Sequence, residues 1–286
     1  MSSQKTALKV RADLSEYTTL KIGPVIRDFY VVNNENELKA LSFRFRGRFY
    51  LLGCGSNLLV SDSGLSRPVL KLGPGFSFCR AIGTDNLVEV GAGTRLANFL
   101  KFCIELGLSG IESHCGIPAS IGGLIRMNAS CYGNQISDYV RTVEAFDVNQ
   151  GILSFSGEEI SFGYRNSSLA DKVILKISLK LKKSKTVKNR LKAFILKRKA
   201  SQELASANCG CIFKNPEGNS AGYLLDSCNL KGIKRNEAMI SLKHANFIVN
   251  TGKASYNDVD YLIKLMKDSV YKRYSIILEE EIQRWT

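Results

Sequence analysis

Hydrophobic and polar positions alternate along the chain in a way that predicts a mixed α and β protein. Short apolar runs between turn residues are typical of strands, and residues 35–41 have the pattern of a short helix. We predict strands at residues 29–32, 49–52, 87–90, 140–148 and 173–181. The first 70 residues then form a small α/β unit.

Helical spacing appears first after Gly93. The apolar residues that follow one another at intervals of three and four are Leu96, Phe99, Leu100, Cys103 and Ile104. They predict a helix from Thr94, with Thr94 as its N-cap and Gly107 just past its end. Further helices are predicted at residues 220–228 and 259–270, and the basic stretch before them is expected to be helical to about residue 204.

Composition limits the class of protein. The chain has 286 residues, 44% of them hydrophobic and 23% charged, which is typical of a globular protein of one to three domains. No apolar run approaches the ~18 residues of a membrane span, and residues 1–15 lack the apolar stretch of a signal peptide. We therefore expect an intracellular, cytoplasmic protein without a membrane span.

Most of the excess positive charge is local. The formal net charge is +14, and residues 176–199 contain eleven Lys or Arg and no acid, which leaves +3 on all other residues. Such a run can bind nucleic acid, or it can be a solvated strand end and helix. We favour the solvated surface because the run matches no nucleic-acid-binding module.

The cysteines do not predict a metal site. The eight cysteines include no pair separated by two residues, and the two histidines have no recognised spacing from a cysteine pair. Without an export signal, reduced thiols are expected rather than disulfides. We therefore predict no bound metal.

Two glycine segments look like parts of a dinucleotide-binding fingerprint. Residues 53–58 and 91–96 each have the first two glycines but lack the third, and no acid ends a strand at the distance needed to bind a ribose. A Rossmann domain for NAD is disfavoured. Residues 116–133 are also rich in Gly and small residues; they could hold an anion such as a pyrophosphate or pack tightly, and the pattern alone leaves both open.

Six segments in order carry a resemblance to a known family. They are GCGSNLLVSD (53–62), GIPASIGGLIRMNASCYG (116–133), FGYRNSSL (162–169), GCIFKNP (210–216), SLKHANFIVN (241–250) and LEEEI (278–282). Together they strongly resemble the MurB family, the UDP-N-acetylenolpyruvoylglucosamine reductases of bacterial cell-wall synthesis. The resemblance extends over residues 18–283. Only 45 residues separate Arg165 from Cys211, and this short spacing resembles the family subtype that lacks an inserted loop with a substrate-binding Tyr.

The resemblance implies an α+β protein with a FAD-binding fold of the p-cresol methylhydroxylase type and a separate α/β substrate-binding domain. It implies a first FAD-binding subdomain at residues 1–73 with a C-terminal strand at 275–286, a second at 74–183, and the substrate-binding domain at 184–274.

The activity that the resemblance implies is a reduction in peptidoglycan synthesis, a process linked to cell shape and cell division. Non-covalent FAD takes hydride from NADPH, and an enolpyruvyl ether on a UDP-sugar becomes the lactyl ether of UDP-N-acetylmuramate. We expect a monomeric or weakly associating enzyme with no nucleic-acid partner. The alternatives are another FAD oxidoreductase of the same fold or a basic nucleic-acid-binding protein.

Three candidate catalytic residues follow from the resemblance. Arg165 matches the Arg of the family's Y-R motif, and a cation there can stabilise charge that develops near the substrate carboxylate. Cys211 stands where most members have a proton-donating Ser; an ordinary thiol, with a pKa of about 8.5, also holds a proton at neutral pH. Glu281 matches the second Glu of L-E-P-E-V, although a strand at residues 278–282 would put Glu279 on the same face.

The same resemblance supplies candidate contacts. Those to the cofactor are Gly53, Cys54, Gly55, Ser56, Asn57, Leu58, Gly116, Ile117, Pro118, Ser120, Gly122, Gly123 and Asn128. Those to the substrate are Tyr164, Lys214 and Asn215, the last two facing the diphosphate or sugar. Ala119 and Ser130 stand where the family pattern has Gly, and Cys131 where it has Ala, so side-chain atoms are added to the cofactor loop.

Overall fold

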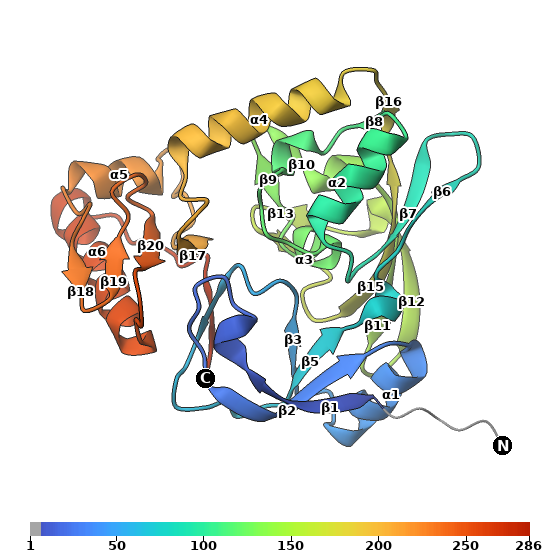
Figure 1. The fold of residues 1–286 in the computed structure, drawn as a ribbon, viewed down its shortest axis with the longest axis horizontal. Coiled ribbons are helices and arrows are strands. Elements are labelled where there is room, and N and C mark those ends of the chain that lie inside the picture. Colours follow the sequence, from blue (N-terminus) through green and yellow to red (C-terminus); the bar gives the residue numbers. More distant parts are fainter. Residues whose placement is uncertain (1–6) are drawn as a thin grey trace. The chain divides into compact units, whose positions relative to one another are not determined.

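The computed structural model describes residues 7–286, which form two compact units (Figure 1). One unit contains residues 27–54 and 67–196 together with the described residues up to 10. The other contains residues 11–26, 55–66 and 197–286. These two units do not test the division into three domains that the resemblance implies, so that division stays a prediction.

A four-stranded sheet near the start of the chain has the order β1-β2-β5-β3, formed by Leu8–Asp13, Val25–Val32, Val69–Leu72 and Tyr50–Leu52. β2 and β3 both run parallel to β5. The predicted short helix is α1 (Glu35–Arg44), and Asn34 caps it by accepting a hydrogen bond from Glu37 N at 2.9 Å. Leu38 and Leu41 of α1 pack with Tyr30 of β2 in one apolar core.

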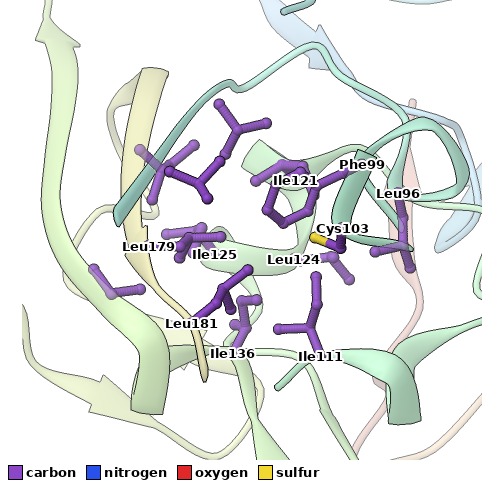
Figure 2. Close-up of a cluster of buried hydrophobic side chains, with 14 of the residues drawn as sticks. Leu96, Phe99, Cys103, Ile111, Ile121, Leu124, Ile125, Ile136, Leu179 and Leu181 are labelled. Carbon is purple, nitrogen blue, oxygen red and sulfur yellow. The ribbon is translucent and has the colours of Figure 1, made fainter. Parts of the chain in front are cut away.

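A five-stranded antiparallel sheet forms most of the rest of this unit. Its order is β12-β11-β15-β7-β6, formed by Gly151–Ser156, Val140–Asp147, Val173–Lys180, Leu87–Gly91 and Cys79–Ile82. The helices α2 (Leu96–Glu105) and α3 (Ile121–Arg126) share an apolar core with it. Figure 2 shows Phe99 and Cys103 of α2 beside Leu124 and Ile125 of α3 in this core. The helix and strands predicted for this region are confirmed.

The predicted cap of α2 was wrong. The N-cap is Arg95, whose backbone is extended because it forms a β-bridge with Ser120. Thr94 Oγ1 instead donates a hydrogen bond to Phe78 O at 3.0 Å. Tertiary pairing therefore moves the start of the helix by one residue.

Short strand pairs complete the first unit, and 3-10 turns occur in both units. The pairs are β8 (Leu108–Ser109) with β16 (Lys182–Lys183), β9 (Ser130–Cys131) with β10 (Asn134–Gln135), and β13 (Phe162–Gly163) with β14 (Asn166–Ser167). The 3-10 turns along the chain are η1 (Leu14–Glu16), η2 (Pro74–Phe76), η3 (Glu112–His114), η4 (Ile136–Tyr139) and η5 (Gly157–Glu159).

The basic helix α4 (Val187–Ser201) leads into the second unit. There, an antiparallel sheet has the order β17-β20-β19-β18, formed by Ala207–Cys211, Phe247–Asn250, Ala238–Ile240 and Lys234–Arg235. It shares a core with α5 (Ala221–Ser227) and α6 (Tyr256–Tyr274). The helices predicted at 220–228 and 259–270 are confirmed.

The end of the chain differs from the prediction. No strand covers residues 278–282; only Glu280 forms an isolated antiparallel bridge, with Phe213. The strand β21 (Gln283–Trp285) starts later and runs parallel to β4 (Leu58–Val60). The alternation of faces expected for Glu279 and Glu281 therefore does not describe this segment.

Candidate functional site

Two of the candidate cofactor segments meet where Gly53 lies against Ser120. A Cβ atom added to Gly53 would stand 3.0 Å from Ser120 Oγ, so a larger residue would crowd this contact. Ser120 is the N-cap of α3, and its Oγ accepts a hydrogen bond from Gly123 N at 3.3 Å. The fold therefore brings Gly53, Ser120 and Gly123 close together, and we call this group of three residues the Gly53 cradle.

Two cations lie beside this cradle. Lys71 Nζ donates a hydrogen bond to Gly53 O at 2.6 Å, and burial is the main cause that lowers the pKa of Lys71. Burial also raises the pKa of Cys54, while the charges of Lys71 and Arg95 lower it. The loop at Gly53 thus lies in a positive field suited to a diphosphate. Sequence reasoning missed both residues, because Lys71 belongs to no recognisable motif and Arg95 lies in the segment 91–96, which was weighed only as part of a Rossmann fingerprint.

The second glycine segment, residues 91–96, is hydrogen-bonded to the Gly-rich loop at residues 116–133. Ile121 N donates to Thr94 O and Gly122 N donates to Ala92 O, each at 2.9 Å. A Cβ atom added to Gly122 would stand 2.9 Å from Ala92 Cβ. Tight packing therefore accounts for Gly122, one of the two explanations that the sequence left open.

The start of the same loop is a sharp bend. Gly116 has a φ of +83°, which favours glycine. Ile117 N donates to His114 O at 3.2 Å, and the Ile117 side chain packs on the apolar core. Pro118 follows without an N–H to donate, and Ala119 O accepts a hydrogen bond from Leu96 N at 2.8 Å. These contacts fix the loop against the N-terminus of α2.

Asn128 has an unsatisfied acceptor. Its side chain is buried, and its Nδ2 donates to Gln135 Oε1 at 3.0 Å and to Gly163 O at 3.1 Å. Its Oδ1 is buried and has no hydrogen-bond partner among the described residues. An unpaired buried acceptor costs about 1–3 kcal/mol, so a ligand N–H here would be stabilising. Together with the Gly53 cradle, this acceptor fits a cofactor such as FAD.

Tyr164 and Arg165 form the two-residue turn between β13 and β14. Arg165 adopts a left-handed φ of +55°, which is strained for a side chain of this size. Its guanidinium lies over the Tyr164 ring, 5.3 Å from the centroid, and its Nη1 donates to Ser130 Oγ at 2.9 Å. Tyr164 is 50% exposed, so the turn presents an aromatic face and a cation together.

In the second unit, the other half of the first cofactor segment forms a tight turn that ends in β4. Gly55 has a φ of +65° and accepts a hydrogen bond from Thr19 N at 3.0 Å, and an added Cβ atom would collide with Tyr17 O. Ser56 and Asn57 continue the turn, and Leu58 starts β4. Asn57 Nδ2 donates to Glu281 O at 2.9 Å. The side chain of Asn57, a candidate cofactor contact, is thus hydrogen-bonded to the backbone of Glu281, a candidate catalytic residue.

Cys211 and Glu281 lie on neighbouring segments. Cys211 ends β17 beside a bulge that contains Gly210, whose φ is +79°. The next residue, Ile212, accepts a hydrogen bond from Glu281 N at 2.8 Å. Cys209 is buried in the core, and burial raises its pKa to about 12, whereas Cys211 is partly exposed. The two cysteines therefore differ in their surroundings: Cys209 is enclosed in the core, and only Cys211 is accessible to a ligand.

The three terminal acids have different surroundings. Glu279 forms an ion pair with Lys214, and Glu280 binds Lys267 and Arg284. Glu281 is held through its backbone beside Ile212. Asn215, next to Lys214, is exposed but its Oδ1 accepts a hydrogen bond from Ala221 N at 3.0 Å, so it also fixes the start of α5.

The candidate residues therefore form two groups. Arg165, Tyr164 and Asn128 cluster in the first unit, while Cys211, Glu281, Lys214 and Asn215 cluster in the second. Within residues 7–286, no group of three His, Cys, Asp or Glu side chains could hold a metal ion. Over the same residues, every helix is too short or too polar to cross a membrane.

Comparison with protein families gives two matches. Residues 33–156 match the family described as FAD binding domain. Residues 202–285 match the family described as UDP-N-acetylenolpyruvoylglucosamine reductase, C-terminal domain. The cradle at Ser120 lies in the first match, and Cys211 and Glu281 lie in the second.

Whole-chain relatives agree with both matches. A UDP-N-acetylenolpyruvoylglucosamine reductase of Heliobacterium modesticaldum is 35% identical and aligns with 94% of this chain and 88% of its own length. One from Thermus thermophilus is 37% identical, with 91% of this chain and 95% of the relative covered. The crystal structure of the Thermus caldophilus reductase (MurB) superposes with a TM-score of 0.85 at 35% identity, covering 98% of this chain and 100% of that one.

Proposed function

The chain belongs to the UDP-N-acetylenolpyruvoylglucosamine reductase family, and we propose that Arg165, Cys211 and Glu281 carry out its reaction. The protein is an FAD-dependent oxidoreductase that uses NADPH to reduce the enolpyruvyl ether of its UDP-sugar substrate in peptidoglycan synthesis. The observation that carries this function is the 35% identity to a reductase over 94% of the chain. The resemblance in fold and activity inferred from the sequence is confirmed.

FAD is held, in our proposal, by the two segments that meet at Gly53 and Ser120. The cradle is supported by Lys71 and Arg95, whose charge suits the diphosphate, and by the unpaired Oδ1 of Asn128, which suits an N–H of the ring. Bound there, FAD would supply the hydride chemistry that links NADPH to the enolpyruvyl carbon. Gly55 and Asn57 shape the remaining part of the first segment.

Arg165 binds the substrate carboxylate. Reduction of an enol ether places negative charge on the carbon next to that carboxylate, and a fixed guanidinium stabilises this charge in the transition state. The strained φ of +55° and the hydrogen bond to Ser130 support this role, because strain of this kind is retained at functional sites. Tyr164, which stacks on the guanidinium, is a contact for the same substrate group.

Cys211 Sγ delivers the proton to the second carbon. A thiol can carry the proton that such a donor must deliver. Its place at the end of β17, more exposed than Cys209, supports access to a substrate. Glu281 lies on the neighbouring segment, and we propose that its carboxylate orients the proton-donating group and the substrate. Lys214 and Asn215 bind the diphosphate or sugar.

The oligomeric state and the cellular location of the enzyme are also part of this proposal. We propose that the enzyme acts as a monomer in the cytoplasm, since its substrates are water-soluble nucleotides. Gel filtration of the flavin-loaded protein tests the first part, with elution at twice the mass of one chain as the contrary result.

Anaerobic spectroscopy tests the function. The purified protein should be yellow, NADPH should bleach the flavin absorbance, and UDP-N-acetylenolpyruvoylglucosamine should restore it. Bleaching by NADPH without recovery on addition of this substrate would instead indicate another oxidoreductase of the same fold. A colourless protein that cannot be loaded with FAD would contradict the function altogether.

A further inference from the structure

Alternate residues of the segment 126–130 hold the turn that carries Arg165. Ser167 Oγ donates a hydrogen bond to Arg126 O at 3.0 Å, on one side of the turn. Asn128 Nδ2 donates to Gly163 O at 3.1 Å, on the other side. Both ends of the hairpin are therefore fixed to a segment that ends at Ser130.

Ser130 makes the contact with the guanidinium itself. Arg165 Nη1 donates to Ser130 Oγ at 2.9 Å and lies 3.4 Å from Ser130 O. Ser130 is in turn held by its position in β9, where it pairs with Gln135 of β10. A hydroxyl fixed on a paired strand can restrict a long side chain that would otherwise sample many rotamers.

We propose that Ser130 is a positioning residue that orients Arg165 toward the substrate carboxylate. The proposal rests on the proposed role of Arg165. It concerns a side-chain hydroxyl that contacts the Arg165 guanidinium directly and has no other proposed role in the reaction. Asn128, whose buried Oδ1 has no partner among the described residues, lies on the same segment. If it contacts the cofactor as proposed, this one segment would align both the cofactor and the substrate-binding cation.

A double-mutant cycle with Ser130→Ala and Arg165→Met tests the proposal. Ser130→Ala should lower kcat/KM for the UDP-sugar about tenfold, which corresponds to about 1.4 kcal/mol. The rate at which NADPH reduces the flavin should not change, because Arg165 does not act in that step. In the Arg165→Met background, adding Ser130→Ala should change kcat/KM by less than about twofold.

Ser130→Thr is the matched control, since it keeps the hydroxyl and suits a strand. It should retain kcat/KM close to that of the unaltered enzyme. A tenfold loss from Ser130→Ala in both backgrounds, or no loss in either, would overturn the positioning role. Failure of the proposed function is distinguishable, because Arg165→Met alone would then leave turnover unchanged.

FAD content must be measured for every variant. If Ser130→Ala loses flavin, Ser130→Gly, which also removes the hydroxyl, replaces it in the cycle. Loss of activity in proportion to loss of flavin in both variants would make Ser130 a cofactor contact and would overturn the proposal. Full flavin content with a loss confined to the UDP-sugar step supports it.

Discussion

Two adjacent glycines of α3 should respond to the same substitution in different ways. In Gly122→Ala, the new Cβ would stand 2.9 Å from Ala92 Cβ and 3.1 Å from Ala92 O. These atoms cannot turn away, because Gly122 N is hydrogen-bonded to Ala92 O at 2.9 Å. In Gly123→Ala, the nearest atom is Ser120 Oγ at 3.3 Å, and a shift of this side chain by a few tenths of an ångström relieves the contact without removing the N-cap.

The expected magnitudes follow from these distances. Replacing Gly by Ala inside a helix stabilises by about 0.5–1 kcal/mol, a gain that both variants share. Overpacking against Ala92 costs about 1–3 kcal/mol, and it applies only to Gly122→Ala. The free energies of unfolding of the two variants should therefore differ by about 1–3 kcal/mol. In a unit of this size, each kcal/mol shifts the melting temperature by about 2–4 °C.

Differential scanning calorimetry of the flavin-free protein is the assay, because removal of FAD excludes effects of ligand binding on stability. Gly123→Ala should melt at or above the temperature of the unaltered protein, and Gly122→Ala clearly below Gly123→Ala. Equal melting temperatures would refute the assignment of Gly122 to tight packing against Ala92.

Three further predictions concern the site and its support. Cys211→Ala should lower turnover by about a hundredfold or more in a steady-state assay, while NADPH still bleaches the flavin. The matched control Cys209→Ala changes a buried cysteine and should keep the reaction. A normal rate for Cys211→Ala would contradict the proton-donor role. Lys71→Met should weaken FAD binding by about tenfold or more in a fluorescence titration, because it removes a partly buried cation that is hydrogen-bonded to Gly53 O. The matched control Lys101→Met removes an exposed cation and should leave the affinity unchanged. Equal affinities of the two variants would argue against a positive cradle. Burial alone would raise the pKa of Glu280, but its hydrogen bonds to Arg284 and Lys267 outweigh burial and lower the pKa below 4.5. The stabilisation by Glu280 is therefore present above pH 4.5 and is lost as pH falls through the lowered pKa. In urea unfolding, Glu280→Gln should cost about 1–3 kcal/mol at pH 7 and little at low pH, and a cost independent of pH would contradict the ionic role.

Periodic patterns predicted the elements that have a clear apolar face. The apolar positions in 96–104 and 259–270 lie in α2 and α6, and the strand runs at 140–148 and 173–181 lie in β11 and β15. Burial of one face stabilises each element, so the pattern is visible in the sequence itself. The six ordered motifs likewise identified the family, which the whole-chain relatives confirm.

Contacts between residues far apart in the sequence determined the features that the hydrophobic patterns did not predict. The start of α2 moved because Arg95 bridges to Ser120, and the segment before β21 is not a strand because only Glu280 finds a bridging partner. Lys71 could not be found from a motif, since its importance comes from a hydrogen bond to a residue 18 positions earlier. The contact between Ser130 and Arg165 joins residues 35 positions apart and is invisible for the same reason.

The most direct test of the central claim is product formation under anaerobic conditions. The flavin-loaded enzyme, given NADPH and UDP-N-acetylenolpyruvoylglucosamine, should form one UDP-N-acetylmuramate for each NADPH oxidised, as measured by mass spectrometry and absorbance. NADPH oxidation that proceeds without this product, or a flavin-loaded enzyme that leaves the substrate unchanged, would contradict the account.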